Sequence, residues 1–513
     1  MKENQLFKSK ETLKKNVVLN TVFRILMIIA PFLTAPYVSR VLMSDGVGVY
    51  SYTQSLVTYF TMFAALGTIS YGSREIARRR ENKEQYSKAF WEIELIAVIC
   101  SGLSLIAWIA LSFLYTEYKV YLLILTFCIL ATTMDISWFY AGLEEYKYTI
   151  SVNLIFKILS VISIFLFVKS PDDVWIYVLI NSISLFAGNA SMWLFLPKFL
   201  VKTRIEKKSL KYHFKETFVY FIPTIATSLY TVIDKTLIGA LIQGETTVVI
   251  NGVETVKKTA EIESGYYEQA TKIIDMVKVV TFVSINSVLY SRASYLYKIK
   301  DYGTIKKMTL QAFQIVTFLT VGAAFGLIGI ASTFVPLFFG AGYEKTILLL
   351  QILASLAPVV CVSGTLGSLY YSPVGKRKQS SIYLIIGAIV NLVLSAPLVL
   401  ILKSVGAAIA SIAAELVIVV LYVYYCNNAI TLKELFRTFW KKVISGGAML
   451  GVLILFNFFV KTHFSNALLF LFVSVIAGFA IYVLMLMILK DDSIRLIPKI
   501  LRRTKDNDYE AKV

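Results

Sequence analysis

Apolar runs of about 20 residues alternate with short polar gaps along almost the whole chain. An apolar helix of ~20 residues spans the hydrocarbon core of a bilayer, and helices or closed barrels are the structures that satisfy every backbone group in lipid. The pattern therefore predicts an all-α integral membrane protein of about fourteen transmembrane helices, at residues 16–38, 48–71, 89–114, 119–140, 149–168, 173–196, 217–242, 268–296, 309–335, 346–370, 380–402, 405–426, 442–460 and 467–489.

Composition agrees with this class. Apolar residues make up 57% of the chain and charged residues only 16%, and the mean hydropathy is +0.70. A soluble protein of 513 residues could not bury that much apolar surface, because its surface-to-volume ratio leaves a large share of the chain facing water.

The basic residues indicate the orientation. Of the 51 Lys and Arg residues, 37 lie in the termini and the gaps on one side, 9 lie on the opposite side, and 5 lie inside predicted spans. Because Lys and Arg concentrate on the cytoplasmic side, both termini are expected in the cytoplasm. The net charge of +19 then reflects topology and contact with anionic lipid, and no nucleic-acid partner is expected.

One gap, between the seventh and eighth spans, is longer than the others and lies on the external side. Within 244–260, the β-rich runs Thr246–Ile250 and Val253–Lys257 flank Asn251–Gly252. Two such runs around Asn-Gly are typical of a β-hairpin. The hairpin is either a decoration or a contact for an exported substrate or partner.

A weak internal repeat suggests two halves. Tyr37–Leu42 followed by Gly46–Tyr50 resembles Val232–Leu237 followed by Gly265–Tyr267. The copies are six spans apart and so have the same orientation, as in transporters built from parallel repeats. The prediction is two six-helix lobes with two appended helices, divided as 1–197 (helices 1–6), a cytoplasmic linker at 198–216, 217–427 (helices 7–12), and 428–513 (helices 13–14 and a basic cytoplasmic tail).

The residues that usually hold metals or cofactors are sparse. Cys100, Cys128, Cys361 and Cys426 lie in or beside spans with no metal-ligand spacing, and they are interpreted as apolar fillers. The two histidines, at positions 213 and 463, are placed in separate loops. No metal site, catalytic base or cofactor is predicted.

Five motifs follow one another along the chain: Ile69–Ala77, Phe90–Glu94, Ile136–Glu144, Ile233–Gly239 and Gly265–Ile273. In this order they resemble the bacterial polysaccharide repeat-unit flippases, the Wzx-type members of the multidrug/oligosaccharidyl-lipid/polysaccharide exporter superfamily. The resemblance runs from about residue 15 to the end of the twelfth span. The chain has Ser291–Arg292 where that family commonly has Pro-Arg, and its hairpin loop is longer than usual.

The resemblance implies a transporter rather than an enzyme. Such proteins carry an undecaprenyl-diphosphate-linked oligosaccharide repeat unit from the inner to the outer leaflet of the bacterial cytoplasmic membrane, by alternating access, for capsule or O-antigen-type polysaccharide. Expected partners are this lipid, membrane lipids, H⁺ or Na⁺ as a coupling ion, and other polysaccharide-assembly proteins. The alternatives are a multidrug/cation antiporter, a peptidoglycan-precursor flippase and, in another class, a membrane polysaccharide polymerase. A polymerase would need a large external loop with catalytic groups.

Ionisable residues inside spans are costly and mark functional sites by default. Arg24 lies about eight residues into the first span, ~12 Å deep, with Asn20 one turn earlier on the same face. A guanidinium suits a diphosphate, and the resemblance also implies a cation in the first helix; a structural pair with an acid is the alternative. Lys235 and Arg292 are further candidates for substrate binding, although Arg292 can also snorkel to the headgroups.

The acids within spans are candidates for ion coupling. These are Asp234, Glu415 and Asp135, which would bind H⁺ or Na⁺. For Glu415 a helix–helix hydrogen bond is an equal alternative. Asp275 and Lys278 are three residues apart, so they are expected to pair along one helix.

Overall fold

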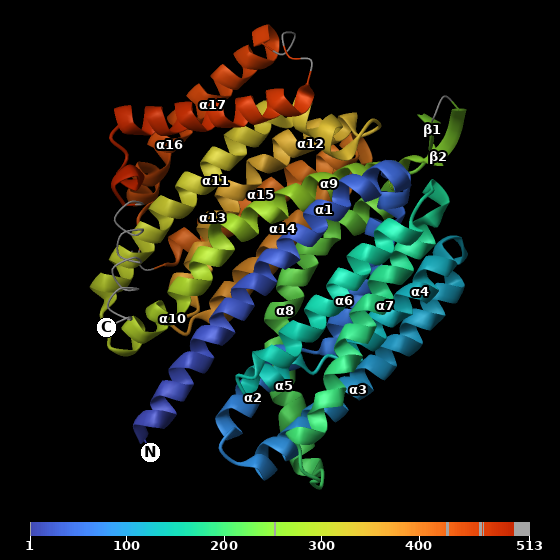
Figure 1. Cartoon of the computed structure of the whole chain (residues 1–513), viewed down its shortest axis with the longest axis vertical. Coiled ribbons are helices and arrows are strands. Elements are labelled where there is room, and N and C mark those ends of the chain that lie inside the picture. The colour runs from blue at the N-terminus through green and yellow to red at the C-terminus, as the bar shows by residue number, and fades with distance from the viewer. Residues whose placement is uncertain (1, 251–252, 427–429, 461–463, 465, 497–513) are drawn as a thin grey trace. The chain divides into compact units, whose positions relative to one another are not determined.

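The computed structural model describes the backbone of residues 2–250, 253–426, 430–460, 464 and 466–496. Side chains are described from residue 30 onward within these ranges, except at 223, 226–230, 249–250, 253, 284, 287–288 and 291. Figure 1 shows the described elements as long helices and one short hairpin. The predicted all-α membrane class is confirmed.

The helices follow the predicted spans, several of them in two pieces. Ten helical segments within the described residues are long and apolar enough to cross a membrane; the count of fourteen stays a prediction. The helices are α1 (Lys2–Ala65), α2 (Thr68–Arg79), α3 (Lys83–Leu114), α4 (Lys119–Thr133), α5 (Ser137–Gly142), α6 (Tyr146–Phe167), α7 (Val174–Met192), α8 (Lys207–Leu241), α9 (Thr259–Lys278), α10 (Ser284–Lys298), α11 (Tyr302–Phe339), α12 (Glu344–Ala354), α13 (Leu356–Leu366), α14 (Arg377–Leu402), α15 (Ser404–Tyr424), α16 (Leu432–Leu455) and α17 (Ala467–Ile488).

The first two predicted spans form a single long element. α1 runs through the predicted gap and breaks only at Met43, whose φ of 58° is left-handed. A single residue also separates the helices that correspond to the eleventh and twelfth predicted spans: Lys403, with φ 56°, is the one residue between α14 and α15. A single residue in this conformation costs little compared with unpaired backbone in lipid, so one residue can redirect the chain.

Helix starts follow local capping chemistry. Asn82 precedes α3 and its side chain accepts a hydrogen bond from the N–H of Gln85. Thr431 precedes α16 and forms a reciprocal capping box with Glu434. Both caps satisfy amide groups that a helix leaves unpaired at its N-terminus.

Two compact units make up the described chain. The first comprises residues 1–239 and 243–265, and the second comprises 240–242 and 266–513. In the first, α4 and α6 pack on α7, and α1 packs on α3, α4 and α6; in the second, α14 packs on α15, and α16 on α11 and α17. α8 and the hairpin thus pack with the N-terminal helices, while the predicted division into six-helix lobes around a 198–216 linker stays a prediction resting on the repeat.

The predicted hairpin is confirmed. Strands β1 (Glu245–Ile250) and β2 (Val253–Lys258) pair antiparallel, and the Asn-Gly turn between them lies outside the described residues. Two salt bridges hold β2 on the first unit: Lys257 Nζ lies 2.8 Å from Asp45 Oδ2, and Lys258 pairs with Glu117.

Candidate functional site

The residues predicted to bind the substrate lie on three helices. Arg24 and Asn20 lie on α1, in the stretch whose side chains are outside the described residues. Lys235, on α8, is half-buried, and Arg292, on α10, is exposed. Their assignment to substrate binding stays a prediction.

Asp234 lies on α8, two residues before a polar contact between α8 and the part of α1 that follows Met43. It is 4% exposed. Nearby on α8, the hydroxyl of Thr236 lies 3.0 Å from both the Ser55 hydroxyl and the Tyr59 hydroxyl of α1. Because buried polar groups need partners, these bonds fix the polar face of α8 against α1.

Glu415 and Asp275 take part in hydrogen bonds that the sequence anticipated. Glu415, on α15, is 3% exposed and accepts a hydrogen bond from the Ser363 hydroxyl of α13, so the helix–helix bond named as its alternative is present. Asp275 Oδ1 lies 3.0 Å from Lys278 Nζ, which confirms the predicted pair along α9.

Asp135, a predicted ion-coupling residue, lines a polar cavity. The cavity is inside the first unit and has a volume of about 390 Å³. Helices α1, α4, α6 and α7 and the break between α4 and α5 contribute its walls. The lining residues are Tyr50, Gln54, Cys128, Asp135, Ser137, Asn153, Phe156, Lys157, Ser160, Asn181, Ser182, Ser184, Leu185 and Asn189.

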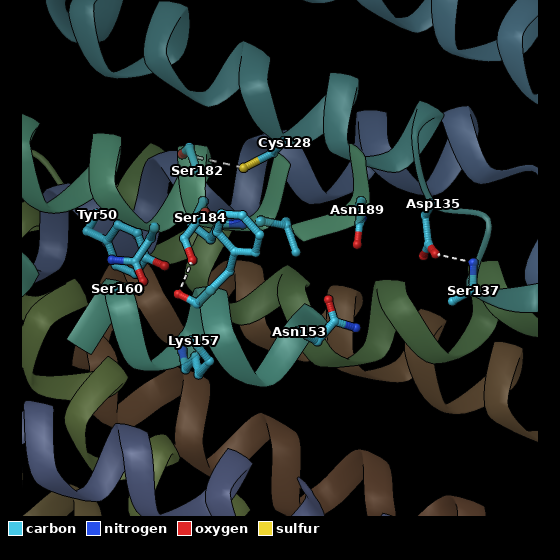
Figure 2. A pocket seen from close by; sticks show the side chains of 14 residues that line it. Tyr50, Cys128, Asp135, Ser137, Asn153, Lys157, Ser160, Ser182, Ser184 and Asn189 are labelled. Atoms are coloured by element: carbon cyan, nitrogen blue, oxygen red, sulfur yellow. Dashed lines mark hydrogen bonds between the residues drawn. The ribbon is translucent and has the colours of Figure 1, made fainter. Parts of the chain in front are cut away.

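Helix breaks and short side chains create this space. α4 ends at Thr133 and α5 begins at Ser137, so Asp135 sits between helices, where its Oδ1 accepts the N–H of Ser137 at 2.9 Å. Figure 2 shows Asp135 at one end of the cavity and Tyr50 and Ser160 at the other, with Asn189 and Asn153 between them.

Some of the polar groups on the walls are committed to backbone partners. Asn189 donates to the carbonyl of Ala131 at 2.9 Å, and Ser184 donates to the carbonyl of Phe156 at 2.7 Å. Ser160 differs, since its buried hydroxyl has no hydrogen-bond partner in the part of the chain that the structure describes. A buried hydroxyl of this kind is a normal contact for water.

The cavity suits water and small ions. At about 30 Å³ per molecule, it has room for roughly a dozen waters. Its walls carry one acid and one base, Asp135 and Lys157, among amides and hydroxyls. A diphosphate-linked oligosaccharide is larger than this space, so the cavity is a candidate for ion or proton binding rather than for cargo.

One sequence-based placement was wrong. His213 is not in a loop but in the first turns of α8, where it is 0% exposed. Its Nδ1 lies 2.6 Å from the Tyr71 hydroxyl and its Nε2 lies 3.2 Å from Glu92 Oε2. Burial lowers the pKa of His213. The misplacement arose because the basic residues around His213 are typical of a loop, whereas in the structure they form the start of a helix.

Glu92 has a structural role that the sequence did not show. Its carboxylate, on α3, accepts the Ser209 hydroxyl at 2.6 Å and the N–H of Glu206 at 3.1 Å. A carboxylate at a helix N-terminus stabilises the unpaired amides there. Glu92 therefore anchors the start of α8 to α3.

Sequence comparisons identify relatives over most of the chain. The family model described as "Polysaccharide biosynthesis protein" matches residues 13–294. A protein of Escherichia coli (strain K12) named "Putative O-antigen transporter" is 24% identical over 428 residues, covering 82% of this chain and 98% of its own. A Shigella dysenteriae protein of the same name is 25% identical over 418 residues, covering 79% and 98%.

Solved structures of similar fold include a flippase and multidrug transporters. A lipid II flippase, MurJ, in an inward closed conformation aligns with a TM-score of 0.69 and 18% identity, over 93% of this chain and 99% of its own. A multidrug resistance MATE family transporter in its inward-facing conformation aligns with a TM-score of 0.56 and 14% identity, over 78% and 97%. At these identities the likeness concerns the fold. The family match, which covers more than half of the chain, confirms the resemblance seen in the motifs: the chain belongs to the polysaccharide biosynthesis protein family.

Proposed function

We propose that this protein moves an undecaprenyl-diphosphate-linked oligosaccharide repeat unit from the inner to the outer leaflet of the bacterial cytoplasmic membrane, for a capsule or O-antigen-type polysaccharide. The observation that carries the proposal is the family match over residues 13–294. Relatives named as O-antigen transporters, aligned over nearly their whole length, support the same substrate class.

The cargo dictates what the protein must provide. A diphosphate and its sugars cannot cross hydrocarbon, whereas the lipid tail need not leave it. A cationic, polar path closed at one end at any time lets the head group cross without leaking ions. Arg24, Asn20, Lys235 and Arg292 are proposed to bind the diphosphate and sugars, and both termini are proposed to be cytoplasmic.

A second candidate is a flippase for the peptidoglycan precursor. The alignment with the lipid II flippase covers more of this chain than the alignment with the MATE transporter. Both cargoes carry a diphosphate on a lipid, so the same cationic groups would serve either. The sugar is what separates the two candidates, and the accumulated lipid reveals it.

Depletion of the protein in its host tests the proposal. A lipid-linked repeat unit should accumulate on the cytoplasmic side, and the unaltered gene should restore surface polymer. Arg24→Ala should reach the membrane but fail to restore polymer, and Arg24→Lys should restore part of it, because the charge survives without the bidentate fork. Arg437→Ala, which removes an exposed arginine of α16, is the control and should restore polymer fully. Accumulation of the peptidoglycan precursor instead would select the second candidate, and accumulation of neither lipid would overturn both.

A further inference from the structure

A buried carboxyl group that none of the above uses lies on α3. Glu94 is 3% exposed, and neither of its carboxylate oxygens has a hydrogen-bond partner among the described residues. Burying an ionised carboxylate without donors is strongly unfavourable, whereas a neutral carboxylic acid tolerates the same place far better. The geometry of Glu94 therefore favours a bound proton.

The charged groups on the neighbouring helices also favour a protonated Glu94. α3 packs against α1, α2 and α4. Glu75 of α2 is engaged by Arg79 and Arg78 of its own helix, and Glu92 is held by the start of α8. Another acid, Asp135, follows α4. Phe90, one turn before Glu94, stacks on Trp138, three residues after Asp135, with ring centroids 5.4 Å apart, so the packing of α3 brings the two acids into the same region. Two nearby carboxyl groups disfavour double ionisation.

Asp135 connects Glu94 to the polar cavity. Asp135 lines that cavity, and the opposite end holds the unpartnered Ser160 hydroxyl. Water, which the volume admits, can pass protons along hydrogen bonds between the two ends, with free hydroxyls such as that of Ser160 as contacts (Figure 2). The cavity thus gives the two carboxyl groups access to protons through Asp135.

We propose that Glu94 and Asp135 form a proton-binding site inside the N-terminal unit, supplied through this cavity, and that its loading and unloading accompany transport. In each loading event a hydronium ion in the cavity gives its proton to a carboxylate, leaving water and a neutral carboxylic acid; unloading is the reverse. The coupling to transport rests on the proposed function, whereas the proton binding does not.

Infrared spectroscopy of the purified full-length protein in lipid tests the proton binding. A pH titration should show a protonated-carboxyl band that Glu94→Gln removes. Asp135→Asn should keep the band but move its midpoint to lower pH, because a neighbouring negative charge is gone. Glu84→Gln, an exposed carboxyl on the first turn of the same helix, is the control and should leave the titration unchanged. Thermal unfolding and size-exclusion profiles of each variant confirm that it is folded.

The transport arm uses vesicles loaded with a pH-sensitive dye. Adding lipid-linked oligosaccharide should trigger proton movement with the unaltered protein, and Glu94→Gln should reduce it to the level of protein-free vesicles. An infrared titration unaffected by Glu94→Gln would overturn the proton site. Transport that follows a Na⁺ gradient and ignores a pH gradient would overturn the coupling. If the unaltered protein moves no oligosaccharide lipid, the proposed function fails, while the infrared result still decides the site.

Discussion

A single histidine links three helices at the start of α8. The imidazole of His213 lies between the Tyr71 hydroxyl and the Glu92 carboxylate. Glu92 also accepts the N–H of Glu206, the residue before α8. Because the ring is fully buried, its charged form is disfavoured, and burial lowers its pKa. The folded state therefore favours the neutral ring.

This lowered pKa predicts a pH dependence of stability. In the unfolded chain a histidine titrates near pH ~6.5, so as the pH falls below that value the unfolded state binds a proton that the folded state resists. The free energy of unfolding should then fall with falling pH, until the folded-state pKa is reached. His213→Gln cannot take up that proton, and it should flatten this part of the profile.

Thermal unfolding of the purified protein between mildly alkaline and mildly acidic pH measures the effect. His213→Gln should cost about 1–2 kcal/mol at alkaline pH through the lost hydrogen bond with the Tyr71 hydroxyl. The difference between variant and unaltered protein should shrink as the pH falls. A constant difference across the whole range would show that His213 does not titrate between the folded and unfolded states.

At the scale of elements, two glycines allow α9 to begin directly against α1. A Cβ at Gly48 would overlap the carbonyl oxygen of Glu261, and a Cβ at Gly265 would overlap that of Ser44. Glu261 also accepts the Tyr118 hydroxyl at 2.9 Å. The two glycine-tyrosine motifs that suggested an internal repeat thus contact each other at the backbone.

Adding a methyl group at this crossing should be destabilising. Gly48→Ala or Gly265→Ala must push the two backbones apart, at a cost of roughly 1–3 kcal/mol as for other overpacked sites. Gly102→Ala, on α3, meets nothing within 4 Å and should be neutral or slightly stabilising in a helix. Thermal unfolding in detergent compares the three. Equal stability of all three variants would contradict the close packing.

At the scale of the whole molecule, the membrane made the helices predictable. Lipid leaves the backbone few choices, so hydropathy placed the spans, and Asn251–Gly252 placed the hairpin. The same sequence could not show that Glu92 would accept a hydrogen bond from Ser209, or that Glu94 would have no hydrogen-bond donor among the described residues. Those contacts depend on which helix faces pack together. Hydropathy that is nearly uniform around each helix does not show which face is buried.

Cysteine labelling of the hairpin tests the predicted membrane topology directly. Val256, on β2, is 62% exposed, and Cys128, Cys361 and Cys426 are buried. Val256→Cys should react with a membrane-impermeant maleimide from outside the cell. Lys208→Cys, in the basic stretch before the seventh predicted span, should react only after permeabilisation. The reverse pattern would place both termini outside.

The most direct test of the central claim is the movement of the lipid itself. Purified protein is reconstituted into vesicles that hold a lipid-linked oligosaccharide in both leaflets, and a glycosidase is added outside. Vesicles without protein should protect the inner-leaflet pool. With the folded protein, and a pH gradient imposed in either direction, the whole pool should become digestible. An inner-leaflet pool that stays protected in the presence of folded protein, under both gradients, would contradict the account.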